Sequence, residues 1–146
     1  MSTATDSLNA VCPHCGTVNR VPAARRDEHP DCGRCGRPLF TGEPLGVGEA
    51  DWDRVVGRTG LPVVVDFWAA WCGPCKAMAP QFEQAAHRLA GRVQFVKVDT
   101  DAEPQLAGRF GIRSIPTMVL LQHGREVRRT SGAMSAAQLE QWLGAA

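Results

Sequence analysis

Six cysteines, arranged as three Cys-x-x-Cys pairs, are the residues most able to do chemistry in this chain of 146 residues. Four thiolates in two closely spaced pairs suit a tetrahedral metal ion. Two thiols at the start of a helix, just after an apolar strand, suit reversible disulfide chemistry. This division uses every cysteine and predicts two domains with two functions. The pairs are Cys12 and Cys15, Cys32 and Cys35, and Cys72 and Cys75.

The first four cysteines have the spacing C-x2-C-x16-C-x2-C, which falls within the range of structural zinc sites. Gly16 and Gly36 each follow a pair, where a positive φ would let backbone N–H groups turn back toward the sulfurs. Four protein ligands leave no open position for water, so we expect one structural zinc ion rather than a catalytic one. Iron in a similar tetrahedral site is an alternative. We expect His14 and His29 to be exposed rather than ligands.

The cysteine-rich segment, residues 11–40, has few large apolar side chains and could hardly fold by burial alone. Metal binding would supply the missing free energy, because binding energy becomes folding energy in such modules. We expect residues 1–10 to form a disordered lead and residues 41–48, rich in Gly and Pro, to form a linker. The second domain then covers residues 49–146.

The third pair follows residues 61–68, an almost wholly apolar run of strand formers typical of a strand covered on both faces. A helix is expected from about Cys72 to Ala90, with Pro74 in its first turn and a kink at Pro80. The N-terminus of a helix offers unpaired N–H groups and the positive end of its dipole, and both favour a thiolate. We expect Cys72 to be the exposed thiol and Cys75 the more buried one. A structural or metal-binding pair is the alternative.

The remaining elements indicate an α/β fold, with a central mixed sheet flanked by helices. Strands are expected at 93–98, 117–122 and 125–130, the last two joined by a tight turn. Helices are expected around Trp52, with Asp51 as a candidate cap, at 103–109, and after Ser135. Ser135 and Gln138 have capping-box spacing, and the helix that follows would present Leu139, Trp142 and Leu143 on one face.

The segment from Val65 to Lys76, VDFWAAWCGPCK, resembles the active-site segment of the thioredoxin family. The resemblance runs from about Asp51 to Leu143 and includes Pro80, residues 110–117, Gly124 and Gly132. With the four-cysteine segment before it, the chain resembles the two-domain, zinc-binding thioredoxins of bacteria. This resemblance implies a thioredoxin fold preceded by a small zinc-ribbon-like module.

The same resemblance implies the catalytic roles. Cys72 would be the nucleophile and Cys75 the resolving thiol, while Asp66 would be a buried carboxylate assisting proton transfer at Cys75. The apolar strand around Asp66 agrees with this role, because desolvation raises the pKa of a carboxyl group. Lys97 matches the family's partner lysine. The alternatives are a strand-end polar residue for Asp66 and a solvated lysine for Lys97.

The resemblance also implies a docking surface for an extended substrate. The bond between Ile115 and Pro116 is expected to be cis, which would leave the Ile115 backbone free to pair beside Cys72. The chain departs from the family at residues 43–48, where a first strand is expected to be poorly formed, and at Ser131, a docking position that is often apolar. The docking surface comprises Trp71, Gly73, Pro74, Ile115, Pro116, Gly132 and Ala133.

These features predict a protein-disulfide reductase with no organic cofactor, recharged by an NADPH-dependent flavin reductase. The Gly73-Pro74 spacer resembles that of the reducing members of the family. A net charge of +1 gives no reason to expect nucleic-acid or membrane binding, and we expect a monomer. The N-terminal residues have no signal-peptide pattern and no apolar run reaches the ~18 residues of a membrane span, so a cytoplasmic location is expected.

Three other functions are alternatives to this one. A disulfide-stapled secreted domain would also use six cysteines, but it fits a cytoplasmic chain poorly. A zinc-dependent holdase or adaptor would dock clients without turnover, and Asp66 beside a complete Trp71–Lys76 motif favours the enzyme over it. A dedicated oxidant of thiols would need an export signal.

Overall fold

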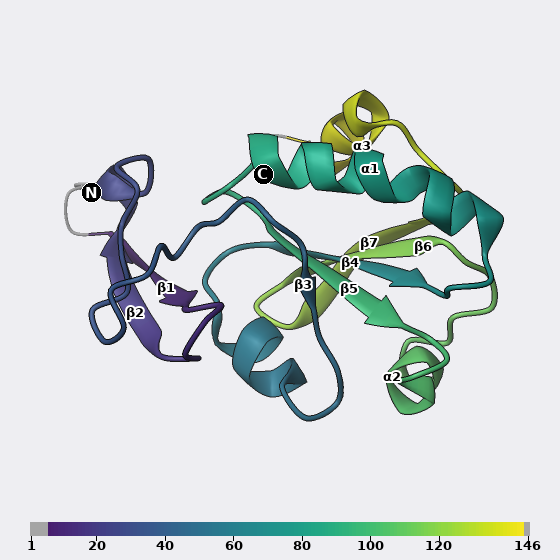
Figure 1. Ribbon diagram of the computed structural model, residues 1–146, viewed down its shortest axis with the longest axis horizontal. Coiled ribbons are helices and arrows are strands. Elements are labelled where there is room, and N and C mark those ends of the chain that lie inside the picture. The colour runs from purple at the N-terminus through teal and green to yellow at the C-terminus, as the bar shows by residue number, and fades with distance from the viewer. Residues whose placement is uncertain (1–5, 145–146) are drawn as a thin grey trace.

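The computed structural model describes residues 6–144 and contains two sheets (Figure 1). A two-stranded antiparallel sheet belongs to the N-terminal segment, and a five-stranded mixed sheet of order β3-β5-β4-β6-β7 forms the rest. The strands are β1 (Ser7–Val11), β2 (Val18–Pro22), β3 (Leu45–Gly46), β4 (Val63–Trp68), β5 (Gln94–Asp99), β6 (Thr117–Gln122) and β7 (Arg125–Ser131). The helices are η2 (Ala23–Arg25), η3 (Asp53–Gly57), α1 (Gly73–Arg88), α2 (Pro104–Arg109) and α3 (Ala136–Leu143).

β4 is the central strand of the large sheet, and it carries the acidic residue and leads to the cysteine pair of the candidate site. It pairs in parallel with β5 and antiparallel with β6, so the sheet is mixed as expected. Five of its six residues are buried, in agreement with the apolar run that predicted a strand covered on both faces. Because β4 is held on both edges, the turn at its carboxyl end has a fixed position.

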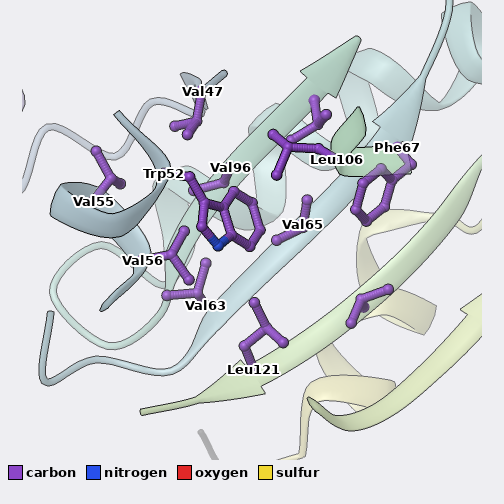
Figure 2. Close-up of a cluster of buried hydrophobic side chains, with 12 residues drawn as sticks. Val47, Trp52, Val55, Val56, Val63, Val65, Phe67, Val96, Leu106 and Leu121 are labelled. Atoms are coloured by element: carbon purple, nitrogen blue, oxygen red, sulfur yellow. The ribbon is translucent and has the colours of Figure 1, made fainter. Parts of the chain in front are cut away.

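Alternate residues of β4 enter two separate cores, one on each face of the sheet. Val63, Val65 and Phe67 pack with residues of η3 and α2, as Figure 2 shows. Val64 packs on the opposite face with residues of α1 and α3, which cover that side in Figure 1. This period of two follows from the pleat of a strand.

The helices match the sequence prediction closely, with one difference at the first. α1 continues through Pro80, and α3 begins at Ser135 with both hydrogen bonds of the capping box. The predicted short helix around Trp52 is instead a π-helical turn, η3, and the Asp51 side chain does not cap it. Asp51 Oδ1 accepts a hydrogen bond from the backbone N–H of Gly48 at 2.8 Å and so stabilises the preceding turn.

The expectation of a disordered lead over residues 1–10 is wrong from Ser7 onward, because Ser7–Val11 is β1 and pairs with β2. Residues 1–5 lie outside the described part of the chain. Residues 41–48 are not only a linker, since they contain β3, which pairs in parallel with β5. β3 has two residues, in line with the poor strand expected from Pro44, Gly46 and Gly48.

The N-terminal segment lies against the larger sheet domain and makes direct contacts with it. The backbone N–H of Gly60 donates to the Asn9 carbonyl at 2.8 Å. Arg92 pairs with Asp27 at 2.9 Å. The Phe40 ring lies so close to Gly91 that a Cβ there would be 3.2 Å from it. A backbone hydrogen bond, an ion pair and an apolar contact therefore hold the two parts together.

Candidate redox and metal sites

The candidate redox site is a disulfide between Cys72 and Cys75 at the N-terminus of α1. Cys72 is the N-cap residue, and Pro74 occupies the first turn, where its missing N–H costs no helical hydrogen bond. The Cys75 N–H points at Cys72 Sγ, with a distance of 3.2 Å between the nitrogen and the sulfur. In the reduced protein this donor and the helix dipole would both stabilise a Cys72 thiolate.

The two cysteines do not differ in exposure, contrary to the expectation that Cys72 would be the exposed one. Each is 3% exposed. In the disulfide, each sulfur covers the other, and the Ile115 carbonyl oxygen lies 3.8 Å from Cys72 Sγ. Burial therefore does not distinguish the nucleophile from the resolving thiol in the oxidised protein.

Asp66 is an acidic residue within the core and is only 1% exposed. Its Oδ1 is buried and has no hydrogen-bond partner among residues 6–144. Burial raises the pKa of Asp66 to about 7, and the nearby positive charge of Lys97 opposes the rise. Lys97 is its register neighbour on β5, and the Lys97 Nζ lies 4.7 Å from the centre of the Trp68 ring. The predicted buried carboxylate and its lysine neighbour are thus close to one another.

The expected docking surface gathers around the start of β6 and the end of β7. The peptide bond between Ile115 and Pro116 is cis, as expected. The Gly132 N–H donates to the Pro116 carbonyl at 2.9 Å, which joins the two loops. Trp71 is 69% exposed, an unusual exposure for so large an apolar side chain. Pro116 and Gly132 of the predicted surface are therefore joined to one another beside Ile115, and the Trp71 side chain is exposed.

Two groups near the site were not anticipated from the sequence. Asp101 Oδ2 accepts a hydrogen bond from Trp71 Nε1 at 3.0 Å and so orients the exposed indole. Asp101 lies just after β5, and the cysteine turn lies just after β4. Because the carboxyl ends of parallel strands meet at the same edge of a sheet, these two positions could have predicted that Asp101 lies near the cysteine turn.

The second unanticipated feature is a contact between the hydroxyls of Thr117 and Ser131, of which only Ser131 was singled out from the sequence. Thr117 Oγ1 donates to the Ser114 carbonyl at 2.7 Å and lies 2.9 Å from Ser131 Oγ. Thr117 is buried, whereas Ser131 is exposed. Register pairs these two residues across β6 and β7, so the sheet itself places the hydroxyls together.

The candidate metal site consists of the four N-terminal cysteines, whose sulfurs all lie within 4.8 Å of one another. Two sulfur pairs, Cys12 with Cys35 and Cys15 with Cys32, are 3.6 Å apart, a separation compatible with ligands on one tetrahedral ion. The exposed His14 is not part of the group and neither is the exposed His29. The predicted ligand set is thus the set that the fold brings together.

Backbone N–H groups surround these sulfurs in the way the glycines predicted. Gly16 and Gly36 have φ of +79° and +77°. The N–H of His14 and the N–H of Arg34 lie 3.4 Å from Cys12 Sγ and Cys32 Sγ. Backbone hydrogen bonding and the Asn19 amide lower the pKa of Cys32. Such donors fit a thiolate, which is the form that binds a metal ion.

Within residues 6–144, no helix is both long and apolar enough to cross a membrane.

Comparisons with known proteins show similarity over both parts of the chain. The thioredoxin family model matches residues 44–145, and a zinc-ribbon model described as "Thioredoxin 2, N-terminal" matches residues 11–37. Thioredoxin C-3 of Corynebacterium nephridii is 46% identical over 133 residues, which cover 91% of each chain. A thioredoxin of Haemophilus influenzae is 40% identical over 69% of this chain and 94% of its own. The crystal structure of a chloroplastic thioredoxin z superposes with a TM-score of 0.63 and 31% identity, over 70% of this chain and 92% of its own.

Proposed function

The chain belongs to the thioredoxin family and is a thiol–disulfide oxidoreductase, and we propose that it reduces protein disulfides through Cys72 and Cys75. The observation that supports this best is the position of the pair. The disulfide lies at the start of α1, beside the Ile115 carbonyl on one side and the exposed Trp71 on the other. The reduced dithiol would donate two electrons to the substrate disulfide, and the Cys72–Cys75 disulfide is the oxidised product.

In the first step the Cys72 thiolate attacks one sulfur of the substrate disulfide. The substrate S–S bond breaks, a mixed disulfide forms between Cys72 and the substrate, and the departing sulfur leaves as a thiolate that takes a proton from water. The Cys75 N–H, directed at Cys72 Sγ, stabilises the negative charge before the attack.

In the second step the Cys75 thiol loses its proton and attacks Cys72 Sγ. The mixed disulfide breaks, the Cys72–Cys75 bond forms, and the second substrate sulfur leaves and is protonated. Asp66 is the proposed acceptor of the Cys75 proton, because a carboxyl group with a pKa of about 7 is ready to take or give a proton near neutral pH. Lys97 would moderate that pKa by stabilising the carboxylate.

Substrate would dock along the seven-residue surface defined above. The Ile115 backbone, held next to Pro116 and Cys72, offers hydrogen bonds to an extended chain, and the exposed Trp71 offers apolar area. We propose that a flavin-containing, NADPH-dependent reductase uses the same surface to restore the dithiol. Both exchanges can occur in a monomer in a reducing compartment such as the cytoplasm, where the four metal-site thiols also stay reduced.

For the metal site we propose one structural zinc ion held by Cys12, Cys15, Cys32 and Cys35. The purified chain should contain one zinc ion and no iron by elemental analysis, and Cys32→Ser should lose it. The core of this module has few buried residues, so metal removal should abolish amide protection in β1 and β2 while β4 and β6 keep theirs. A module that stays protected in the metal-free protein would contradict the structural role.

Variants of the two cysteines test the redox function directly. Cys72→Ser should abolish reduction of a disulfide-containing test protein, and Cys75→Ser should accumulate a mixed disulfide visible by mass spectrometry. Ala77→Ser, which introduces a serine at an exposed position of α1 and keeps both thiols, is the matched control. Full activity in Cys72→Ser would rule out this mechanism.

A further inference from the structure

The hydroxyl pair between β6 and β7 has a defined proton arrangement. Thr117 Oγ1 lies 2.7 Å from the Ser114 carbonyl oxygen, which can only accept. A threonine hydroxyl has one proton, so that proton is committed to the carbonyl. At the 2.9 Å contact between the two hydroxyls, Thr117 therefore accepts and Ser131 donates.

This arrangement leaves Ser131 with no proton to offer elsewhere. Both lone pairs of its oxygen are free to accept, and Ser131 is exposed. Ser131 Oγ is consequently a hydrogen-bond acceptor at the protein surface. A serine hydroxyl without this contact could both donate and accept, so the contact with the buried Thr117 limits the exposed Ser131 to accepting hydrogen bonds.

Ser131 lies next to the docking surface. The following residue, Gly132, donates its N–H to the Pro116 carbonyl, and Thr117 directly follows Pro116. The same loop brings the Ile115 carbonyl to 3.8 Å from Cys72 Sγ. A peptide extended along Ile115 toward the end of β7 would reach Ser131 within a residue or two of its own cysteine.

We infer that Ser131 is a specificity-determining residue that favours protein disulfides with a hydrogen-bond donor side chain beside the attacked cysteine. The inference rests on the proposed function and concerns the choice among its substrates. An apolar residue beside the cysteine would leave the Ser131 acceptor desolvated and unpaired, which costs binding free energy. A donor such as a threonine, serine or asparagine side chain would satisfy it.

Disulfide-bonded peptides that differ only in threonine or valine next to one cysteine test the inference, since the two side chains are nearly isosteric. The threonine is placed before or after the cysteine in separate peptides, and kcat/KM is normalised to the rate with dithiothreitol. The full-length protein should prefer threonine in one of the two positions by about three- to tenfold. Ser131→Ala should remove the preference, while Ser114→Ala, which leaves the accepting carbonyl in place, should retain it.

A third peptide, with O-methylthreonine, tests the proton arrangement because this side chain only accepts. The unmodified protein should not prefer it to valine. Thr117→Val frees the Ser131 proton to donate, so only that variant should reduce the O-methylthreonine peptide with a higher kcat/KM than the valine peptide. If Ser131→Ala keeps the threonine preference, the inference is wrong while the redox function stands. If the unmodified protein reduces none of the peptides, the proposed function fails and the inference fails with it.

Discussion

Asp66 is a single residue whose burial makes the stability of the folded protein depend on pH. Its carboxyl group is 1% exposed, and Oδ1 has no partner among the described residues. Burial raises the pKa of Asp66 from an ordinary 3.8 to about 7. The unfolded chain therefore loses this proton at a lower pH than the native protein does.

Asp66→Asn should change the pH dependence of stability. Below about pH 4 both states hold the proton, so burial of the charge costs nothing. As pH rises toward 7 the unfolded state ionises first, and the native protein loses stability at about 1.4 kcal/mol per pH unit. The variant has no such loss, so its free energy of unfolding relative to the unmodified protein should increase by up to about 4 kcal/mol between pH 4 and pH 8.

Urea unfolding of the oxidised protein at a series of pH values measures this difference. Asp53→Asn, at an exposed position, is the matched control and should show no comparable trend. A constant offset between Asp66→Asn and the unmodified protein at every pH would contradict the burial argument.

At the scale of one element, the helices are stabilised at their ends by local hydrogen bonds. In α3, Ser135 Oγ accepts from the Gln138 N–H at 3.2 Å, and the Gln138 side chain accepts from the Ser135 N–H at 3.0 Å. α3 then buries Leu139 and Leu143 against α1 and the sheet. The cap therefore supports a helix of only eight residues, which would be marginal without tertiary packing.

Ser135→Ala should lower the free energy of unfolding by about 1 kcal/mol, because the Gln138 N–H at the start of α3 loses its acceptor, Ser135 Oγ. Gln138→Ala removes the other hydrogen bond, which the Gln138 side chain accepts from the Ser135 N–H, and should cost less than loss of the N-cap side chain. Thermal unfolding of the two variants gives the comparison. Equal stability of Ser135→Ala and the unmodified protein would show that water replaces the cap without cost.

At the scale of the whole molecule, the metal-binding module is docked through close backbone contact. The Gly60 N–H donates to the Asn9 carbonyl, and a Cβ on Gly60 would lie 3.1 Å from the Asn9 nitrogen. Backbone atoms on both sides cannot move independently, so a larger residue at Gly60 would push β1 away from the sheet domain.

Gly60→Ala should loosen the module, increase hydrogen exchange in β1 and lower the unfolding free energy by about 1 kcal/mol. Gly57→Ala is a matched control, because a Cβ at Gly57 meets nothing within 4 Å. The control should be as stable as the unmodified protein or slightly more so, since alanine restricts the unfolded chain. Equal protection of β1 in both variants would show that the module is held by its other contacts.

The chemistry of this protein could be predicted from its amino-acid sequence. Its cysteine spacing predicted the four-sulfur cluster, and the apolar strand before Cys72 predicted a thiol pair at a helix start. Local signals were sufficient here because ligand spacing, caps and strand periodicity act over a few residues. The positions of Asp66 and Pro116 followed from resemblance to a family and agree with the fold.

Features that depend on contacts between separate segments of the chain could not be predicted in this way and are known from the fold. β3 forms because β5, much later in the chain, pairs with it, although Pro44 and the glycines give β3 no strand pattern. Cys72 likewise lies against the Ile115 carbonyl, and the Trp71 indole donates to Asp101. Both of these neighbours are far from the cysteine pair in the sequence. The proton arrangement at Ser131 depends on strand register, because hydrogen bonds between distant hydroxyls form only where the assembled sheet places them side by side.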